Sequence, residues 1–153
     1  MADVLIRDTT LRDVVDLANN LRVADRAEMA AYGHTEPIGA LTRSAVSSMM
    51  CWSAFIDGEL AAILGCAPIN IIGGVGSPWM MGTPVLDRHQ RILVRHTPGY
   101  IARMLAVFPH LVNFVHTENT TSVRWLRRLG FTLHEAAPYG ALGAPFHKFE
   151  MRA

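Results

Sequence analysis

The sequence predicts a single mixed α/β (α+β) domain: one central sheet of about six or seven strands, flanked by helices. Two observations predict it. The chain has 153 residues, the size of one domain, and half of them are hydrophobic, enough to build a core without disulfides or metal. Segments with strand and helix periodicity alternate along residues 1–153 without a linker or repeat, in the expected order β-α-α-β-β-β-α-β-α-β-β.

The first third of the chain is expected to form one strand and then two or three helices. Apolar residues recur there at intervals of three and four, and Thr9 or Thr10 can cap the first helix. Gly33 is expected to end the second helix and Pro37 to open the third. The expected bounds are residues 4–6 for the strand, and 11–21, 24–32 and 37–49 for the helices.

A hairpin is expected in the middle of the chain. Asp57-Gly58 separates two apolar runs, at 52–56 and 60–65, and both residues tolerate the positive φ of a tight turn. A glycine-rich connection at 71–76 then leads to a strand around 79–82, interrupted near Pro84.

The second half is expected to alternate helices and strands. Asp87 opens a short helical segment, and Thr97 with Pro98 starts the main helix afresh, as N-cap and first helical residue; Pro109 ends it. The later elements are expected at 111–115 (strand), 120–129 (helix), 131–134 and 146–151 (strands), with a loop at 138–140.

Composition limits the function classes. The formal net charge of +1 gives no argument for nucleic acid or a membrane surface, and no apolar run is long enough to span a bilayer. The first residues do not resemble a signal peptide, so a cytoplasmic protein is expected. Cys51 and Cys66 are expected to be buried free thiols. The seven histidines lack metal-ligand spacing, so no metal site is expected.

The most specific motif runs from Asn119 to Phe131. Asn119 can cap a helix, Gly130 can end it in a left-handed conformation, and Ser122, Trp125, Leu126 and Leu129 would form its buried face. This segment, between two strands, resembles the motif of the GNAT (GCN5-related N-acetyltransferase) superfamily. The resemblance implies the GNAT fold for the whole chain.

A second resemblance covers nearly the whole chain. The runs 24–28, 74–83 and 140–146 are similar to those of small GNAT-like proteins of tailed phages, some of them labelled internal virion proteins. This resemblance implies a phage or prophage origin, and the cytoplasm would then be that of the host.

The GNAT resemblance implies acetyl-CoA as cosubstrate, held between two splayed parallel strands with its pyrophosphate on a helix N-terminus. The usual glycine-rich phosphate loop is absent, because Leu93 and Arg95 occupy its glycine positions. A substitute site would use Arg91 and Arg95 and the amides of Gly99 and Tyr100. An ordinary capped helix behind a solvated basic segment explains the same residues equally well.

Two further features of the segment from Asn119 to Phe131 bear on the cosubstrate site. Asn119 is the remaining candidate for contact with the cosubstrate. The arginines at 124, 127 and 128 would share one helix face, either as a solvated surface or as a site for nucleic acid or the 3′-phosphate of CoA.

The general acid that the resemblance implies is missing. Leu126 stands where the family has a tyrosine that protonates the leaving thiolate. Candidate general bases are Glu28, His116 and Glu118, and the last two would point to the same side of a strand end. A structural or solvent-exposed role for each of the three fits the sequence as well.

Two functions therefore stay open. The first is an acetyl-CoA-dependent N-acetyltransferase that acts on an amine of a protein or small molecule. The second is a non-catalytic GNAT-like protein that acts in virion assembly or binds a host protein, for which the missing loop and tyrosine argue. Low charge and eight methionines suit a surface covered in a homodimer or an assembly.

Overall fold

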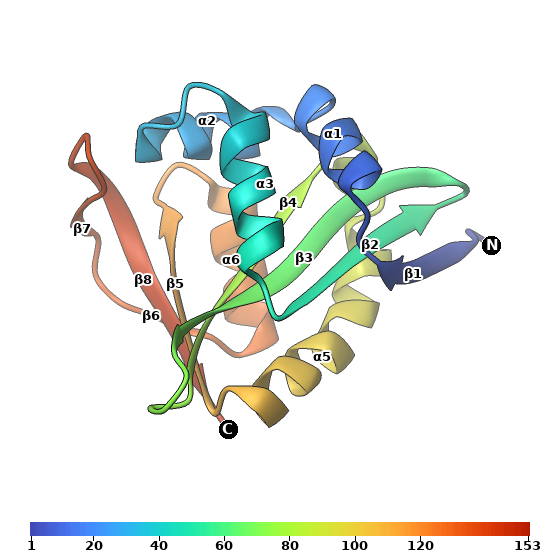
Figure 1. Cartoon of the computed structure of the whole chain (residues 1–153). Coiled ribbons are helices and arrows are strands. Elements are labelled where there is room, and N and C mark those ends of the chain that lie inside the picture. The colour runs from blue at the N-terminus through green and yellow to red at the C-terminus, as the bar shows by residue number, and fades with distance from the viewer.

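A computed structural model describes residues 1–153, which form one open sheet of eight strands with helices on both faces (Figure 1). The strands are β1 (Val4–Asp8), β2 (Met50–Ile56), β3 (Glu59–Asn70), β4 (Val75–Gly82), β5 (His110–His116), β6 (Thr132–Leu133), β7 (Ala137–Tyr139) and β8 (Ala144–Arg152). The helices are α1 (Leu11–Asn19), α2 (Val23–Tyr32), α3 (Pro37–Ser47), α4 (Pro84–Arg88), α5 (Gln90–Val107) and α6 (Thr120–Leu129). None of the helices is long and apolar enough to cross a membrane.

The sheet contains one parallel pair, and that pair separates. The strand order is β1-β2-β3-β4-β5-β8-β6, with β7 also paired to β8. Strands β4 and β5 are parallel and pair only at Val75–His110 and Gly76–Leu111, after which they diverge. The side chain of Asn113 spans the divergence by donating from Nδ2 to the Pro78 carbonyl over 2.7 Å. The remainder of β4 and β5 therefore leaves a gap in the sheet, called the splay below.

The core divides into two layers because side chains alternate along β3. Ile63 packs with α1, α2 and α3, whereas Leu64 packs on the opposite face with α5 and α6. Ala62 joins the side chains of α4 and the start of α5 on that second face. All three side chains are buried, so β3 is a central strand covered on both sides.

Several local expectations are confirmed. Thr10 caps α1 in a capping box with Asp13, and Asn119 Oδ1 accepts from the Ser122 amide at the start of α6. Gly33 and Gly130 end α2 and α6, each at φ 100°. The Asp57-Gly58 turn joins β2 and β3 at φ 50° and 80°. Cys51 and Cys66 are free thiols; Cys66 is buried as expected, but the expected burial is wrong for Cys51, which is half-buried.

The expected start of the main helix at Thr97 is wrong. Helix α5 begins at Gln90 and continues through Pro98, which lies in its interior. The Thr97 hydroxyl donates to the Leu93 carbonyl over 2.6 Å, whereas the carbonyl that Pro98 deprives of its helical donor is that of Val94. Leu93 is 3% exposed, and burial of such a side chain contributes about 1.5–3 kcal/mol, which offsets much of the proline's cost.

Two smaller expectations are also wrong. Asp87 does not open a helix; Thr83 caps α4 and Asp87 lies within it, with its carboxylate directed at Arg22. The loop expected at 138–140 contains β7, which makes eight strands where six or seven were expected. Glycines at φ 79° and 66°, Gly140 and Gly143, let β7 fold back on β8 in a turn too short to show strand periodicity.

Candidate active site

A basic cavity of about 420 Å³ lies where the N-termini of α5 and α6 meet. Gln90 and Arg91 come from the first turn of α5, and Thr121 and Ser122 from that of α6. Unpaired amides and the positive end of the helix dipole favour an anion at such termini. The basic residues of this cavity, called the arginine cavity, are Arg22, Arg91, Arg124 and Arg128.

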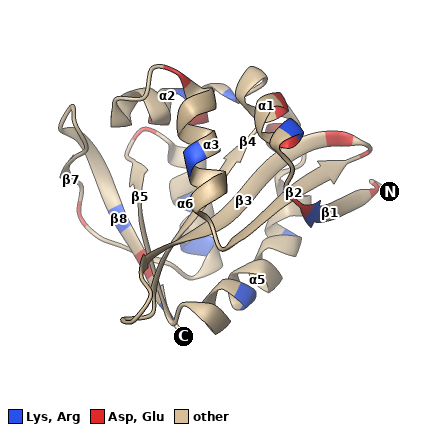
Figure 2. Ribbon diagram, in the orientation of Figure 1, with Lys and Arg blue, Asp and Glu red and all other residues tan.

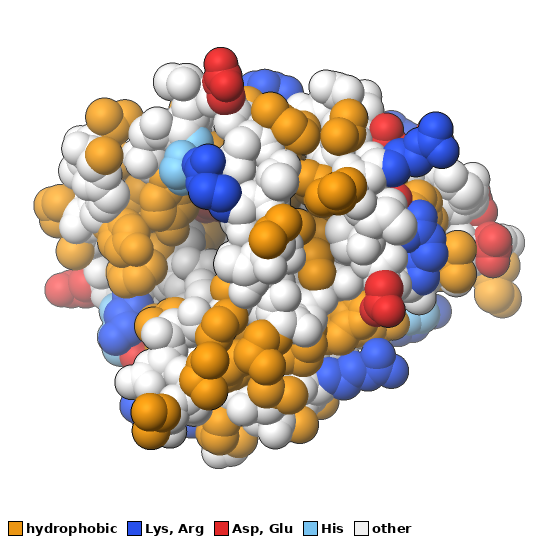
Figure 3. Space-filling model, viewed as in Figure 1, with side chains coloured by type: hydrophobic (Ala, Val, Ile, Leu, Met, Phe, Trp, Pro, Cys, Tyr) orange, Lys and Arg blue, Asp and Glu red, His pale blue; other side chains and the backbone are white.

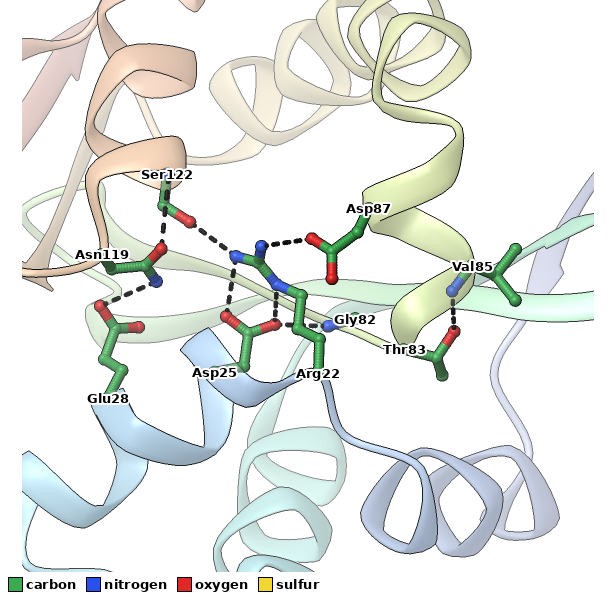
Figure 4. A network of polar contacts seen from close by, with 9 residues as sticks. All are labelled: Arg22, Asp25, Glu28, Gly82, Thr83, Val85, Asp87, Asn119 and Ser122. Atoms are coloured by element: carbon green, nitrogen blue, oxygen red, sulfur yellow. Dashed lines mark hydrogen bonds and ion pairs between the residues drawn. The ribbon is translucent and has the colours of Figure 1, made fainter.

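The floor of the arginine cavity is an ion-pair network (Figure 4). Arg22, 4% exposed, donates from Nε and Nη2 to the two oxygens of Asp25, over 2.7 and 3.0 Å. The same guanidinium reaches Asp87 Oδ1 at 3.1 Å and Ser122 Oγ at 2.9 Å. It thereby joins α2, α4 and α6, which enter the site from distant parts of the sequence.

Helix α2 also closes the end of the splay. Asp25 Oδ2 accepts from the Gly82 amide at the end of β4 over 2.8 Å, and the Gly82 carbonyl accepts from the Arg22 amide. One turn later, Glu28 Oε1 accepts from the His116 amide at the end of β5, also over 2.8 Å. The two carboxylates thus hold the two strand ends apart.

Glu28 is a buried carboxyl group whose pKa is raised. It is 7% exposed, and burial raises its pKa to about 7, with a smaller contribution from the Asp25 carboxylate. The bond from the His116 amide opposes that shift, and Asn119 Nδ2 lies 3.5 Å from Oε1. A carboxyl group with a pKa near 7 can take up a proton at neutral pH.

An unpaired donor lies beside the arginine cavity. The indole Nε1 of Trp125 is buried and has no hydrogen-bond partner, which is a costly state for a polar group. Trp125 lines both the arginine cavity and a neighbouring pocket of about 70 Å³, walled almost entirely by apolar side chains. Met80 and Leu126 line this apolar pocket. An acceptor atom of a bound molecule there would satisfy the indole.

A third cavity, of about 340 Å³, opens on the other face of the sheet. Ser77 and Met81 of β4 line it, the alternate residues Pro78 and Met80 line the apolar pocket, and the large side chain of Trp79 lines both. It is called the aromatic cavity because Tyr32, Trp79 and Tyr139 form its walls. Figure 3 shows this face hollowed beside α3.

One edge of β4 is left facing the splay. Pro78 and Gly82 turn backbone groups away from β3, and these groups have partners. Asn113 donates to the Pro78 carbonyl. The Gly82 amide donates to Asp25, and the Gly82 carbonyl accepts from the Arg22 amide. Met80 lies midway and has the same orientation, so its N–H and C=O face the gap between the strands. An extended molecule in the gap could pair with them.

The structure brings together three of the candidates from the sequence and separates the others. Glu28, His116 and Asn119 meet, although His116 takes part through its backbone amide while its ring packs on Phe146. Arg91 lines the arginine cavity. Glu118 is exposed, and the expectation that it shares a face with His116 is wrong, because β5 ends at His116 and a turn follows.

The substitute phosphate site does not form as expected. Arg95 is exposed and lies outside the lining of the arginine cavity. Gly99 and Tyr100 lie in the interior of α5, where amides bond within the helix, because α5 starts at Gln90. Tyr100 instead packs edge-on against Trp52, with ring centroids 4.8 Å apart.

Arg22, Asp25 and the Trp125 indole were not identified as site residues from the sequence. Arg22 and Asp25 resemble ordinary charges near the start of a helix, and their spacing of three is common on exposed surfaces. A sequence contains no sign that an indole lacks a partner. The sequence predicted a helix face made of the arginines at 124, 127 and 128. Two of them, Arg124 and Arg128, line the arginine cavity.

The open mixed sheet with one splayed parallel pair is the fold of the GNAT acetyltransferases. No model of a known protein family matches the sequence, and no curated protein matches it.

Solved structures of this fold match nearly the whole chain. The ribosomal-protein-alanine N-acetyltransferase of Brucella melitensis has a TM-score of 0.75 at 14% identity, covering 97% of this chain and 99% of that one. A GNAT-family acetyltransferase of Bacillus anthracis has 0.72 at 10%, covering 99% and 96%. The phosphinothricin acetyltransferase of Sinorhizobium meliloti, in complex with AcCoA, has 0.71 at 13%, covering 97% and 88%.

Proposed function

We propose that this protein is an N-acyltransferase that moves an acetyl group from acetyl-CoA to an amine of a protein or small molecule. The observation that supports this most is the pair of cavities on opposite faces of the splay. One is basic and lies at two helix N-termini, the other is aromatic, and Glu28 lies at the strand end between the two sides. Such an arrangement lets two substrates approach one point from opposite sides.

The residues present fit CoA. Arg91, Arg124 and Arg128, with the helix starts around them, suit a diphosphate and a 3′-phosphate. The unpaired Trp125 N–H and the free edge of Met80 suit the amide groups of the pantetheine arm. Of the residues that the sequence predicted for the phosphate site, Arg91 belongs to the site proposed here. Arg95, Gly99 and Tyr100 do not.

Acetyl-CoA would supply an acetyl group on a thioester, so that transfer forms a C–N bond and breaks a C–S bond. Glu28 would accept the proton that the attacking ammonium must lose, since its pKa of about 7 leaves it ionised in part of the molecules at neutral pH. Leu126 lines the apolar pocket and cannot donate a proton, so the thiolate would leave without help from that position.

Calorimetry with CoA and acetyl-CoA tests the proposal directly. Each should bind with one site per chain, and single-turnover release of free thiol should require an added amine. Absence of binding at millimolar cosubstrate would refute the enzyme hypothesis.

The alternative is a non-catalytic GNAT-like protein that acts in virion assembly or binds a host protein. The missing glycine loop and the apolar Leu126 favour it, as do the exposed isoleucines of the β3–β4 turn, Ile71 and Ile72. Binding of CoA without turnover would support it. A phage or prophage origin belongs to both hypotheses, and the genes next to the coding sequence would test it.

A further inference from the structure

The aromatic cavity has rigid walls. The Tyr32 hydroxyl donates to the Phe114 carbonyl over 3.2 Å, and burial raises the pKa of Tyr32 well above its usual value, so the hydroxyl keeps its proton. Tyr139 lies against Phe114, with ring centroids 3.7 Å apart. Trp79 Nε1 donates to Ser48 Oγ over 2.9 Å. These side chains hold their positions without a ligand, so the cavity is preformed.

The floor of this cavity is the splay itself. Ser77 of β4 and Asn113 of β5 both line it, one from each of the diverging strands. Asn113 is occupied by its own bonds to the Pro78 carbonyl and the Phe114 amide. On α2, Met29 and Tyr32 line the cavity; Met29 directly follows Glu28, which itself is not a lining residue. A molecule bound here therefore lies over the splay and beside the turn of α2 that follows the proposed base.

The permanent charge at the opening of the aromatic cavity is positive. No acidic residue lines the cavity, and its only permanently charged lining residue is Arg43, which is exposed on α3 and makes no ion pair or side-chain hydrogen bond. Figure 2 shows a basic and no acidic position on α3. His34 lies at the same rim. A second cationic group on an acceptor would meet no counter-charge, whereas an anionic group would meet a guanidinium.

From these observations we infer that the acceptor is a small amine whose apolar or aromatic body separates the amine from a carboxylate or similar anion. The amine lies over the splay, the body lies between Tyr32, Trp79 and Tyr139, and Arg43 binds the anion. A volume of about 340 Å³ suits one ring and its substituents. Polyamines and other multiply cationic acceptors are disfavoured. This inference rests on the proposed function, because it assigns the second substrate of the same site.

Three probes of one shape test it: 4-(aminomethyl)benzoate, 4-methylbenzylamine and 4-(aminomethyl)benzylamine. They share the amine and the ring and differ only in an anionic, neutral or cationic para group. Binding is measured by calorimetry on the full chain saturated with CoA, so the readout does not depend on turnover. The anionic probe should bind about tenfold tighter than the neutral one, and the cationic probe weakest.

Variants assign the preference to one residue. Arg43→Gln should bring the anionic and neutral probes to within about twofold, and Arg43→Glu should favour the cationic probe. Arg12→Gln, an exposed arginine of α1 outside the cavity, is the matched control and should leave the order unchanged. Unfolding midpoints of all variants should agree, because neither arginine is buried.

The outcomes separate this inference from the proposed function. Preferential binding of the anionic probe without acetylation supports the ligand class inferred for the cavity, and it contradicts the enzyme hypothesis and with it the role of that ligand as an acceptor. Acetylation of all three probes with equal efficiency, or best with the dication, overturns the inference and leaves the enzyme hypothesis standing. The inference also fails if the anionic probe shows no binding at millimolar concentration, or if a peptide amide competes better than it does.

Discussion

Asp25 and Glu28, one turn apart on α2, accept hydrogen bonds from the ends of the two diverging strands. Asp25 bonds the Gly82 amide of β4 and Glu28 the His116 amide of β5, each over 2.8 Å. The two carboxylates have different surroundings. Asp25 is paired with Arg22 through two bonds, whereas Glu28 forms no ion pair. The same helix therefore provides a structural carboxylate and one free to exchange a proton.

The buried pair should dominate the stability of the site. Arg22→Met keeps the apolar stem but leaves Asp25 buried without a counter-charge, and we expect it to lower the free energy of unfolding by about 3–5 kcal/mol. Urea denaturation measures this. Arg88→Met, which removes an exposed pair with Glu59, is the control and should change stability by less than about 0.5 kcal/mol. A loss below about 1 kcal/mol for Arg22→Met would contradict the role given to this pair.

Glu28 should make stability fall as pH rises. Its pKa is 4.5 in an ordinary environment and about 7 when folded, so the folded state binds the proton more tightly. The stabilising contribution is complete below pH 4.5 and is lost as pH rises through about 7, a change of about 3 kcal/mol. Glu28→Gln should abolish this loss and be more stable than the parent above pH 7. Equal pH profiles from denaturation of the two proteins would refute the shift.

Glu28→Gln, which should raise stability above pH 7, should lower the rate of turnover. If Glu28 is the base, the rate should rise with pH through about 7, because the ionised form accepts the proton. Glu28→Gln should lower the rate by about 10²- to 10⁴-fold and remove that inflection. Glu118→Gln, which changes an exposed carboxylate nearby, serves as the control and should retain parental rates.

Arg91 and Arg95 lie one turn apart on α5, and only Arg91 lines the arginine cavity. Arg91→Ala should weaken CoA binding roughly tenfold, the usual effect of losing one charged hydrogen bond. Arg95→Ala should leave the dissociation constant unchanged at physiological salt, where screening weakens distant charges. Equal losses for both variants in calorimetry would indicate a diffuse basic surface in place of a defined phosphate site.

Trp125→Phe should separate stability from binding. The change removes an indole N–H that is buried without a partner, so the free protein should gain up to about 1 kcal/mol of stability. If that N–H donates to the cosubstrate, the variant should bind CoA several-fold more weakly. Thermal shifts with and without CoA give both quantities. Unchanged affinity would remove Trp125 from the binding site.

Pro98 tests the continuity of α5. In a helix interior, proline costs about 3 kcal/mol relative to alanine, so Pro98→Ala should stabilise the protein by about 1–3 kcal/mol. At a helix start, the proline would be favourable and the same substitution neutral or harmful. Chemical denaturation distinguishes these cases, and a loss of stability would contradict the continuous helix.

The sequence alone determined most features that depend on neighbours within four or five residues. The cap at Asn119, the helix end at Gly130 and the turn at Asp57-Gly58 follow from side chains that act on adjacent backbone. The order of strands and helices follows from apolar periodicity, and the resemblance of the Asn119–Phe131 segment to the GNAT motif implied the fold. Asn119, at the start of α6, was identifiable for the same reason, whereas Glu28, in the middle of α2, was a candidate only through the GNAT resemblance.

Only the tertiary structure determined which of those candidates form a site. The bonds that define it join residues 57 to 100 positions apart: Asp25 to Gly82, Glu28 to His116, and Arg22 to Ser122. The burial of Leu93 likewise overrode the local preference that made Pro98 a helix start. The pKa of Glu28 and the unpaired Trp125 indole depend on desolvation, which is a property of the packed whole and is not encoded in local sequence patterns.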